Sequence, residues 1–302
     1  MKNLTFKQLR ALKSVALTGS VTAASEELAV TPPAVTLQIQ QLEEQVGLPL
    51  LERGRNGFRL TEPGKVIFEL AKQLEEQLRQ AEESIYNLRG VEGGRIRIGV
   101  ISTAKYFMPK AIAAFLRDHL EIQLDLKVGN RQEIVSGLRS ASFDFAIMGR
   151  PPEDLAVISE VIGDHPHVFI SSPLHSLSSI KNITLEKLTN ETPLLREQGS
   201  GTRMLLHRFL TEQKIEWRKG MEMGSNESIK QGVMAGLGIS FISAHTIAAE
   251  VEEGRLAVLD VAGTPLIRHW YLVRLQEKKL LPASLAFWEF LKKSCRDFLP
   301  KL

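Results

Sequence analysis

The N-terminal part of the chain carries three stripes of apolar residues at helical spacing. In residues 5–17 an apolar residue recurs at every third or fourth position, which places these residues on one face of a helix. Gly19 is suited to end this helix, and Ser20 is suited to cap a second one in the small-residue segment "VTAASEELA". A third apolar stripe runs from Val35 to Val46. Two short helices, a tight turn and a third helix are typical of a helix-turn-helix.

The third helix opens with two adjacent prolines, in the segment "TPPAVTLQIQQLEEQVG". The N–H groups in the first turn of a helix have no intrahelical acceptor, so Pro32 and Pro33 are tolerated there, and Thr31 is predicted as the cap. A residue that precedes proline is pushed toward an extended conformation. We therefore expect helical geometry to begin at Pro33.

The face of this third helix opposite its apolar stripe is compact and mostly polar. It holds Pro33, Leu37, Gln40 and Gln41, with Thr36 on its edge. Glutamine pairs well with adenine edges, and apolar groups pack on the thymine methyl group. The face is therefore predicted to read DNA, although glutamine-rich faces are often only solvated.

A hairpin is predicted directly after the third helix. Two short apolar runs flank "RGRNG", in which Asn-Gly is a strong turn signal. Arg53, Arg55 and Arg59 lie at or beside the tip. A two-stranded flap that carries arginines is suited to reach into a narrow minor groove, so this segment is interpreted as a wing.

A single long helix is predicted over residues 62–89. Its apolar positions repeat every three or four residues, Thr61 is the expected cap, and Pro63 is acceptable in the first turn. One apolar seam on so long a helix needs a partner, most simply the same helix of a second copy. We expect a DNA-binding domain over 1–61 and a linker and dimerisation helix over 62–90.

The remaining residues, 91–302, alternate between strand and helix patterns. This alternation predicts an α/β module with largely parallel sheets. Small polar or basic residues follow several strands, where ligands of α/β proteins bind and where helix N-termini favour carboxylate or phosphate. The residues at these junctions are Ser102 and Thr103, Ser200, Gly201 and Thr202, and Ser225 and Asn226, with Asn130, Arg131 and Arg150 as further candidate donors. For each junction the alternative is an ordinary helix cap.

Composition and charge are those of an ordinary globular protein. Of 302 residues, 43% are hydrophobic and 24% are charged, as in ordinary globular proteins. The net charge of +3 is a weak argument for nucleic acid, because residues 1–90 hold equal numbers of basic and acidic side chains. The single cysteine, Cys295, excludes a disulfide within the chain. The first residues show no apolar signal core, and a cytoplasmic location is expected.

Enzyme and metal alternatives have weak support in the sequence. "GSGTR" does not form a G-x-S-x-G elbow, and there is no Walker loop, so we predict that the protein is not an enzyme. "DHPH" places Asp164, His165 and His167 together without a further cluster at ligand spacing, and no metal or cofactor is expected. A further alternative is a solute-binding module whose N-terminal helices mediate only assembly.

The order of these parts resembles a known family. The segment from "FKQLRALKSVALTGS" to "FRLTEPG" resembles the winged helix-turn-helix of LysR-type transcriptional regulators. The rest is similar to that family's effector domain, a two-lobed fold like periplasmic binding proteins. The resemblance implies an all-α winged helix-turn-helix, a long linker helix and an α/β effector module. Its lobes would span about 91–162 with 266–302, and about 163–265.

Within the family, segments such as "FDFAIMGRPP" and "REQGSGTRM" look like the CbbR group, which controls carbon-fixation genes and responds to phosphorylated sugars. They are also similar to the rhizobial LsrB-type regulators, linked to oxidative stress and cell-surface genes. The resemblance implies promoter DNA as a partner, a homotetramer built from dimers, and a small anionic effector (a phosphorylated sugar, carboxylate or dinucleotide). The effector-binding residues that it implies are Ser102, Thr103, Asn130, Arg150, Thr202 and Asn226. Implied DNA contacts come from Thr31, Pro33, Thr36, Gln40, and Arg53 or Arg55.

This chain departs from the family pattern at three positions of the third helix. Pro32 stands where a hydrogen-bonding side chain is common, Thr36 where serine is common, and Gln40 where a basic residue is frequent. The preferred DNA site is therefore expected to differ from that of close relatives. Because the chain has one cysteine, a sensing mechanism that forms a disulfide between two of its own thiols is not expected.

Overall fold

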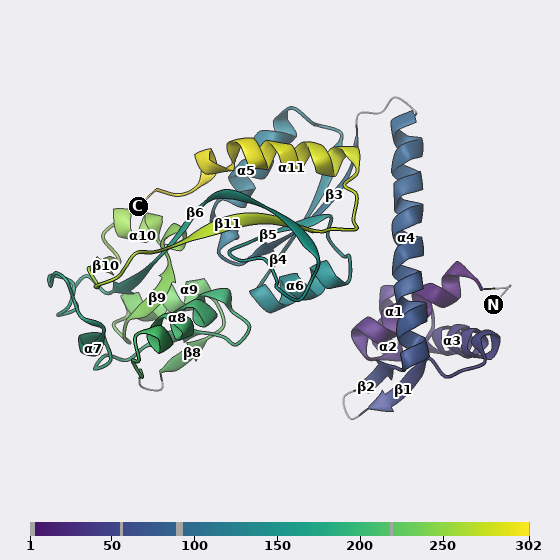
Figure 1. The fold of residues 1–302 in the computed structure, drawn as a ribbon, viewed down its shortest axis with the longest axis horizontal. Coiled ribbons are helices and arrows are strands. Elements are labelled where there is room, and N and C mark those ends of the chain that lie inside the picture. The colour runs from purple at the N-terminus through teal and green to yellow at the C-terminus, as the bar shows by residue number, and fades with distance from the viewer. Residues whose placement is uncertain (1–3, 55–56, 89–92, 218–219, 302) are drawn as a thin grey trace. The chain divides into compact units, whose positions relative to one another are not determined.

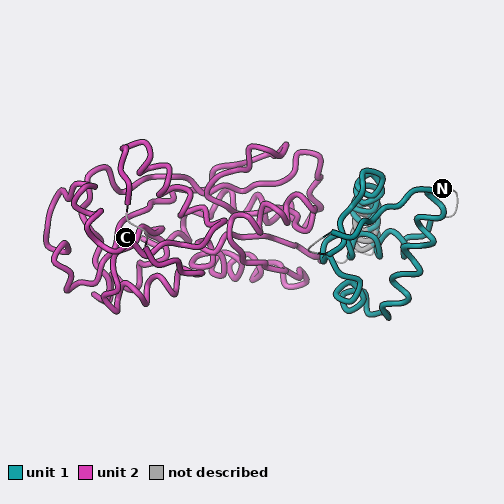
Figure 2. The backbone as a smooth tube through the Cα atoms, turned by 90° about the horizontal axis from the view of Figure 1, so that it is seen from below, with its two compact units in different colours: residues 1–89 teal, residues 90–302 magenta. Residues whose placement is uncertain are grey.

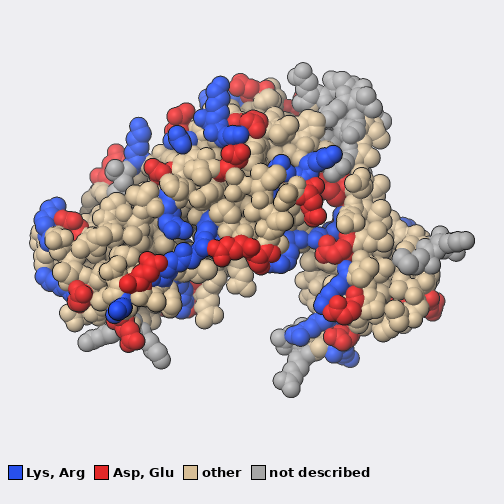
Figure 3. All heavy atoms as spheres, in the orientation of Figure 1, with Lys and Arg blue, Asp and Glu red and all other residues tan. Residues whose placement is uncertain are grey.

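The computed structural model describes residues 4–54, 57–88, 93–217 and 220–301. The chain divides into two compact units, residues 1–89 and residues 90–302 (Figure 2). No helix among the described residues is both long and apolar enough to cross a membrane. Acidic and basic side chains are interspersed on the face drawn in Figure 3, in keeping with the small net charge.

The first unit is helical apart from one hairpin (Figure 1). The side chain of Thr5 and that of Gln8 form a capping box at the start of the first helix, which ends at Gly19 in the left-handed conformation, with φ 69°. Ser20 caps the second helix, as expected. In chain order the elements are α1 Phe6–Thr18, α2 Val21–Glu27, α3 Pro32–Val46, β1 Leu51–Gly54, β2 Gly57–Leu60 and α4 Glu62–Leu88.

Helix α3 corrects the prediction about the two prolines in two ways. The helix begins at Pro32, one residue before the predicted start at Pro33. Thr31 does occupy the cap position, but its side chain accepts no capping hydrogen bond. A capping side chain bonds the N–H of the second or third helical residue, and the second is Pro33, which has none.

The hairpin segment is tied to the ends of α1 and α3 by one backbone hydrogen bond and by one side chain. The N–H of Phe58 donates to the carbonyl oxygen of Gly19 over 2.9 Å. A Cβ atom at Gly57 would lie 2.3 Å from that same oxygen, so only glycine permits this approach. A carboxylate oxygen of Glu43 accepts from the N–H of Leu50 over 2.7 Å. The predicted hairpin is confirmed, and its position relative to α3 is fixed.

Helix α4 buries only the first part of its apolar seam within the unit. Ile67 and Ala71 are buried in a cluster with residues of α1 and α3. Farther along, Leu74, Leu78 and Ile85 are 39%, 47% and 53% exposed. The later part of the seam therefore lacks apolar cover among the described residues of this unit.

The second unit contains the remaining elements, which surround a mixed seven-stranded sheet (Figure 1). The strands are β3 Gly94–Ile101, β4 Ile122–Gly129, β5 Phe145–Met148, β6 Val157–Ser171, β7 Leu194–Arg196, β8 Met221–Met223, β9 Ser240–Ser243, β10 Ala257–Leu259 and β11 Leu266–Leu275. The helices are α5 Met108–Arg117, α6 Arg131–Arg139, α7 Leu185–Leu188, α8 Gly201–Glu212, α9 Asn226–Met234, α10 Ala248–Glu252 and α11 Pro282–Ser294, with 3-10 turns η1 Ala104–Tyr106, η2 Ala244–Thr246 and η3 Cys295–Phe298.

The prediction of largely parallel sheets is wrong for the strands that pair with β6 and β11. The main sheet has the order β10-β6-β11-β5-β3-β4, with β9 also paired to β6. β3 is parallel to β4 and β5, but β6 is antiparallel to β9, β10 and β11. β6 carries the chain toward β9 and β10, and β11 carries it back to β5, so the two strands run in opposite directions.

The hydrophobic core of the second unit is divided into separate clusters. The largest joins β3, β5, α5 and α11 around Phe145, Trp270 and Phe287. Two others pack β6, β9 and β10 against the helices near them, around Phe169 and Ile242. We call the part around β3–β5 the first lobe and the part around β7–β10 the second lobe. β6 and β11 run through both, and the residue bounds of the lobes stay predictions.

Candidate effector cavity and DNA-reading surface

A cavity of about 100 Å³ lies in the second unit. Both lobes contribute to its walls, through the ends of β3 and β5, the start of α6, the first half of α8, and the strands β6, β7 and β11. Its lining residues are Ile101, Ser102, Thr103, Asn130, Arg131, Gly149, Arg150, His165, His167, Arg196, Ser200, Gly201, Thr202, Met204, Leu205, Arg208 and Arg268.

The strand-to-helix junctions take different roles in this cavity. Asn130 is a true cap, because its side-chain oxygen accepts from the N–H of Glu133 over 3.0 Å at the start of α6. Ser200 occupies the cap position of α8 without any side-chain capping bond, and it is buried. Thr103 is also buried, and its hydroxyl oxygen has no hydrogen-bond partner among the described residues. Buried polar atoms are normally paired, so Thr103 is suited to meet a ligand.

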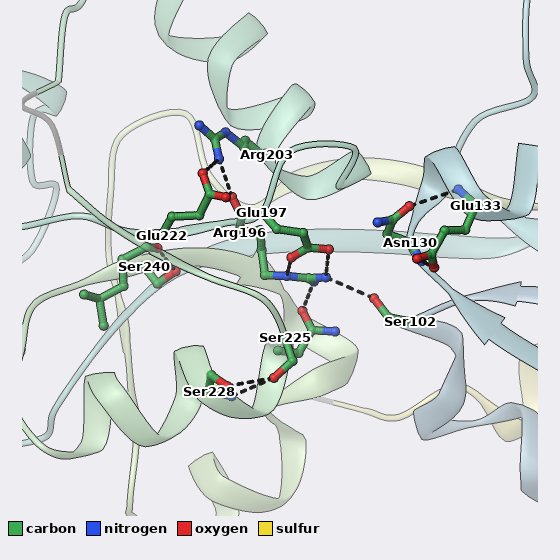
Figure 4. A network of polar contacts seen from close by, with 12 residues as sticks. Ser102, Asn130, Glu133, Arg196, Glu197, Arg203, Glu222, Ser225, Ser228 and Ser240 are labelled. Atoms are coloured by element: carbon green, nitrogen blue, oxygen red, sulfur yellow. Dashed lines mark hydrogen bonds and ion pairs between the residues drawn. The ribbon is translucent and has the colours of Figure 1, made fainter. Parts of the chain in front are cut away.

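The most connected side chain of the cavity is Arg196, at the end of β7 (Figure 4). Its Nε and Nη2 atoms donate to the two carboxylate oxygens of Glu197, each over 2.8 Å. Nη2 also donates to the hydroxyl of Ser102 in the first lobe over 3.3 Å, and Nη1 donates to the side-chain oxygen of Asn226. Arg196 is only 4% exposed. The guanidinium thus ties the two lobes together at the wall of the cavity.

The charge of the cavity lining is one-sided. Five of the lining residues are arginines, and none is aspartate or glutamate. Burial and the neighbouring charge of Arg150 lower the pKa of Arg131, whose guanidinium donates to the backbone oxygens of Arg150 and Pro151. A lining that is positive and partly desolvated is suited to an anionic ligand.

Two buried histidines, His165 and His167, also line the cavity. Their rings lie 4.2 Å apart, and that of His165 stacks on Trp270 at 3.8 Å. Burial lowers the pKa of His165 well below its usual range, and it lowers that of His167 to about 3. Nδ1 of His165 has no hydrogen-bond partner among the described residues. Both rings are therefore neutral near pH 7 and able to donate or accept a hydrogen bond.

Five of the six predicted effector-binding residues lie in the cavity wall: Ser102, Thr103, Asn130, Arg150 and Thr202. Asn226 is not in the wall, and it contacts Arg196 instead. Sequence reasoning missed Arg196, His165 and His167 as lining residues. One signal for Arg196 was available, a cation directly at the end of the apolar run "PLL".

The polar face of α3 is exposed. Thr31, Pro33, Thr36 and Gln40 are all exposed, while the stripe beginning at Val35 is buried. The hydroxyl of Thr36 donates to the backbone oxygen of Pro32 over 3.1 Å, so its methyl group and its oxygen lone pairs remain available.

The wing carries exposed basic side chains of the same unit. Arg53 is exposed on β1, opposite Phe58 of β2, and Arg59 is exposed on β2. Arg55 lies outside the described residues.

Comparison with known proteins decides the family. Residues 6–65 match the model for the bacterial regulatory helix-turn-helix protein of the lysR family, and residues 89–296 match the LysR substrate binding domain. The chain belongs to the LysR family. A LysR-family protein of this kind is a DNA-binding transcriptional regulator, and α2 and α3, with the turn between them, lie in its helix-turn-helix domain.

One curated relative of this LysR-family chain is the HTH-type transcriptional regulator CbbR of Xanthobacter flavus. It is 46% identical over 300 residues, which cover 99% of this chain and 90% of that protein. The resemblance to the CbbR group is thereby confirmed.

Two solved structures share the LysR-family fold. The regulatory domain of Synechocystis CcmR in complex with 2-PG is 34% identical with a TM-score of 0.64, and covers 66% of this chain and 96% of that one. Full-length CbnR complexed with its target DNA is 25% identical with a TM-score of 0.65, and covers 96% of this chain and 100% of that one.

Proposed function

We propose that this LysR-family regulator senses a small anionic metabolite, with a phosphate or carboxylate group, in the cavity of its second unit. The observation that carries the proposal is the lining, which holds five arginines, no acidic residue, and the unpaired hydroxyl of Thr103. The related CcmR regulatory domain was solved with 2-PG, a small anion. Ser102, Asn130, Arg150 and Thr202 are the further proposed contacts, and Asn226 acts through Arg196.

The metabolite would act by favouring one arrangement of the two lobes. Ser102 and Arg150 belong to the first lobe, and Arg196 and Thr202 to the second, so a ligand that contacts both changes the free energy of their relative position. A ligand shifts an equilibrium only by its difference in affinity for the two states. The proposed consequence is a changed spacing of the DNA-binding units in an oligomer.

The exposed part of the α4 seam supports self-association. Leu74, Leu78 and Ile85 follow one another at helical spacing and are exposed in the single chain. A second copy of α4 would cover them with side chains of the same kind. We propose a dimer through α4, and a tetramer built from two such dimers.

Sequence-specific DNA contacts are proposed for α3. Thr31, Pro33, Thr36 and Gln40 form the exposed face that would read base edges and backbone, and Gln40 offers the amide that pairs with adenine. Arg53 of the wing would contact the minor groove, with Arg55 as its neighbour in sequence. We propose a cytoplasmic site of action, where promoter DNA is found.

Carbon-fixation genes are the favoured targets. The CbbR relatives match nearly the full chain, including both matched domains. The alternative, an LsrB-like regulator of oxidative stress, is disfavoured by the only cysteine. Cys295 is buried, and burial raises the pKa of its thiol to about 12, which leaves little thiolate for oxidation.

A mobility-shift assay with DNA from upstream of the protein's own operon tests this function. The full-length protein should bind this DNA specifically, and 2-phosphoglycolate or a phosphorylated sugar should change its affinity. The double variant Ser102→Ala/Thr202→Ala should keep DNA binding and lose the response to the metabolite. A protein that binds metabolite but no DNA would be a solute-binding module, and a variant that retains the full response would exclude the proposed cavity.

A thermal-shift screen should accompany the DNA assay. Phosphorylated sugars, 2-oxoglutarate and NADPH represent the three classes of anion that the cavity lining could accept. Turnover of any of these compounds, followed by product formation, would contradict the proposal that the protein is not an enzyme.

A further inference from the structure

We propose that His165 donates a hydrogen bond from its Nδ1–H group to an oxygen atom of the anionic metabolite, and that Ser243 holds the ring in the tautomer that allows this. Both residues lie outside the six positions that the family resemblance implies for effector binding. The inference rests on the proposed function, because it adds a neutral donor to that same cavity. The supporting geometry comes from the neighbours of the ring, which are Ser243, Trp270 and Gly149.

The contact with Ser243 shows which ring nitrogen of His165 carries the proton. Nε2 of His165 lies 2.9 Å from the hydroxyl oxygen of Ser243, and both side chains are buried. Among the described residues, this hydroxyl has no other hydrogen-bond partner. A buried O–H group needs an acceptor, and in this contact only an unprotonated Nε2 can accept. Because burial lowers the pKa of His165 well below its usual range, the ring is neutral, and its one proton lies on Nδ1.

The Nδ1 atom of His165 is a buried donor that lacks an acceptor. It has no hydrogen-bond partner among the described residues, and His165 is only 2% exposed. The ring stacks on Trp270 with centroids 3.8 Å apart and an angle of 15° between the planes, which fixes the plane in which the N–H group points. An unpaired buried N–H group costs free energy, and an oxygen atom of a bound ligand would remove this cost.

Gly149, directly after β5, leaves one side of this nitrogen uncovered. A Cβ atom at this position would lie 3.0 Å from Nδ1 of His165, whereas the nearest atom of Ile101 would be 4.0 Å away. Gly149, His165 and Ile101 all line the cavity. Any larger residue at position 149 would therefore cover Nδ1 from a side that belongs to the cavity wall.

A neutral N–H donor adds something that the arginines of the cavity lack. Five flexible cations attract anions of many shapes, whereas one N–H group on a stacked and buried ring favours a ligand with an oxygen atom at one place. Phosphate and carboxylate oxygens both accept hydrogen bonds, so this donor is compatible with the 2-PG held by the related CcmR domain. His165 would therefore contribute to the selection among anions.

Solid-state ¹⁵N NMR of the full-length protein, with both ring nitrogens of histidine labelled, shows where the proton lies. The signals of His165 are those missing from the spectrum of His165→Asn. We expect a protonated Nδ1 and an unprotonated Nε2, and the Nδ1 signal should shift when 2-phosphoglycolate is added. Ser243→Ala removes the donor to Nε2 and should convert the single tautomer into a mixture, which a purely structural role of Ser243 would not do.

Calorimetric titration with 2-phosphoglycolate and with ribose 5-phosphate measures the contribution to affinity. His165→Phe keeps an aromatic ring against Trp270 and removes Nδ1, so the dissociation constant should rise about tenfold, as for one lost hydrogen bond to a charged group. His165→Asn places an amide N–H group close to the position of Nδ1 and should recover part of the affinity. His269→Phe, at an exposed position of β11 outside the lining, should stay within about twofold of the wild type.

Gly149→Ala tests the same contact with His165 in place. Its methyl group would cover Nδ1, so the affinity should fall as in His165→Phe. This variant keeps the inference testable if His165→Phe does not fold.

The outcomes distinguish the inference from the proposed function. An unprotonated Nδ1, an unchanged affinity in His165→Phe, or an equal loss in His269→Phe overturns the donor role of His165 while the cavity remains the binding site. An unchanged spectrum in Ser243→Ala overturns the role of Ser243. If the wild-type protein binds neither 2-phosphoglycolate nor ribose 5-phosphate, the proposed function and this inference are both overturned.

Discussion

The indole N–H of Trp270 donates a 3.1 Å hydrogen bond to Nδ1 of His245, and both side chains are buried. Nδ1 accepts this bond only when it carries no proton. The ring of His165 stacks on the indole of Trp270 and is buried as well. Neutral histidines are thus built into β6 and the turn η2, beside Trp270 of β11.

The stability of the protein should therefore fall in mild acid. Burial lowers the pKa of His245 to about 4 and that of His167 to about 3, from a usual value of 6.5. The unfolded chain takes up these protons first, so the free energy of unfolding is largest above about pH 6.5 and decreases as the pH falls toward about 4. Each such histidine contributes up to about 1.4 kcal/mol per pH unit.

His245→Gln checks this relationship. Glutamine preserves an acceptor for the indole of Trp270 and removes one titrating group. The unfolding free energy of the full-length protein, measured in urea between about pH 6.5 and pH 4.5, should decrease less steeply in the variant. The difference in slope should correspond to about one fewer proton taken up on unfolding. Equal pH slopes in the two proteins would show that His245 does not drive the acid sensitivity.

Charge reversal on the wing should weaken DNA binding at every sequence. Arg53→Glu removes one exposed cation of β1, and phosphate or minor-groove contacts do not depend strongly on a particular base. The slope of log affinity against log salt should fall by about 1. Fluorescence anisotropy with operator and with unrelated DNA measures both quantities, and Lys293→Glu, on α11 of the other unit, is the matched control. Unaltered affinity at moderate salt would remove the wing from the interface.

Substitution of Gln40 should change specificity instead. Gln40→Ala deletes an exposed amide of α3 that can pair with adenine, at an expected cost of about 1–3 kcal/mol on the preferred operator. Binding to unrelated DNA should persist. Gln73→Ala, at an exposed position of α4, controls for the loss of a glutamine. Competition assays with operator variants report the result, and an equal loss on all sequences would contradict base reading by Gln40.

A charge in the α4 seam should separate the subunits. Leu78 is 47% exposed in the single chain, and Leu78→Glu would place an unpaired carboxylate in an interface that α4 forms with its copy. Light scattering after size-exclusion chromatography should show a shift to smaller species, whereas Gln77→Glu, an exposed neighbour, should leave the mass unchanged. A Leu78→Glu protein of unaltered mass would place the interface elsewhere.

The helices of the first unit could be predicted from the sequence, because their signals are local. The capping residue Ser20, the stop at Gly19 and the buried stripe from Val35 all depend on neighbours within a few positions. The same holds for the pairing of β1 with β2 in the wing. The start of α3 at Pro32 was misjudged, since the local bias before proline is weaker than the packing of the whole helix.

The sequence by itself thus determined the order of domains, the exposed face of α3 and most of the small polar residues of the cavity. Tertiary structure alone decided the antiparallel pairing of β6 with β11 and the meeting of Arg196 with Ser102, which are far apart in the chain. It also decided the burial of His165 and His167. Local patterns reflect interactions between near neighbours, whereas the pKa of a buried ring and the partners of a guanidinium depend on groups that only folding brings together.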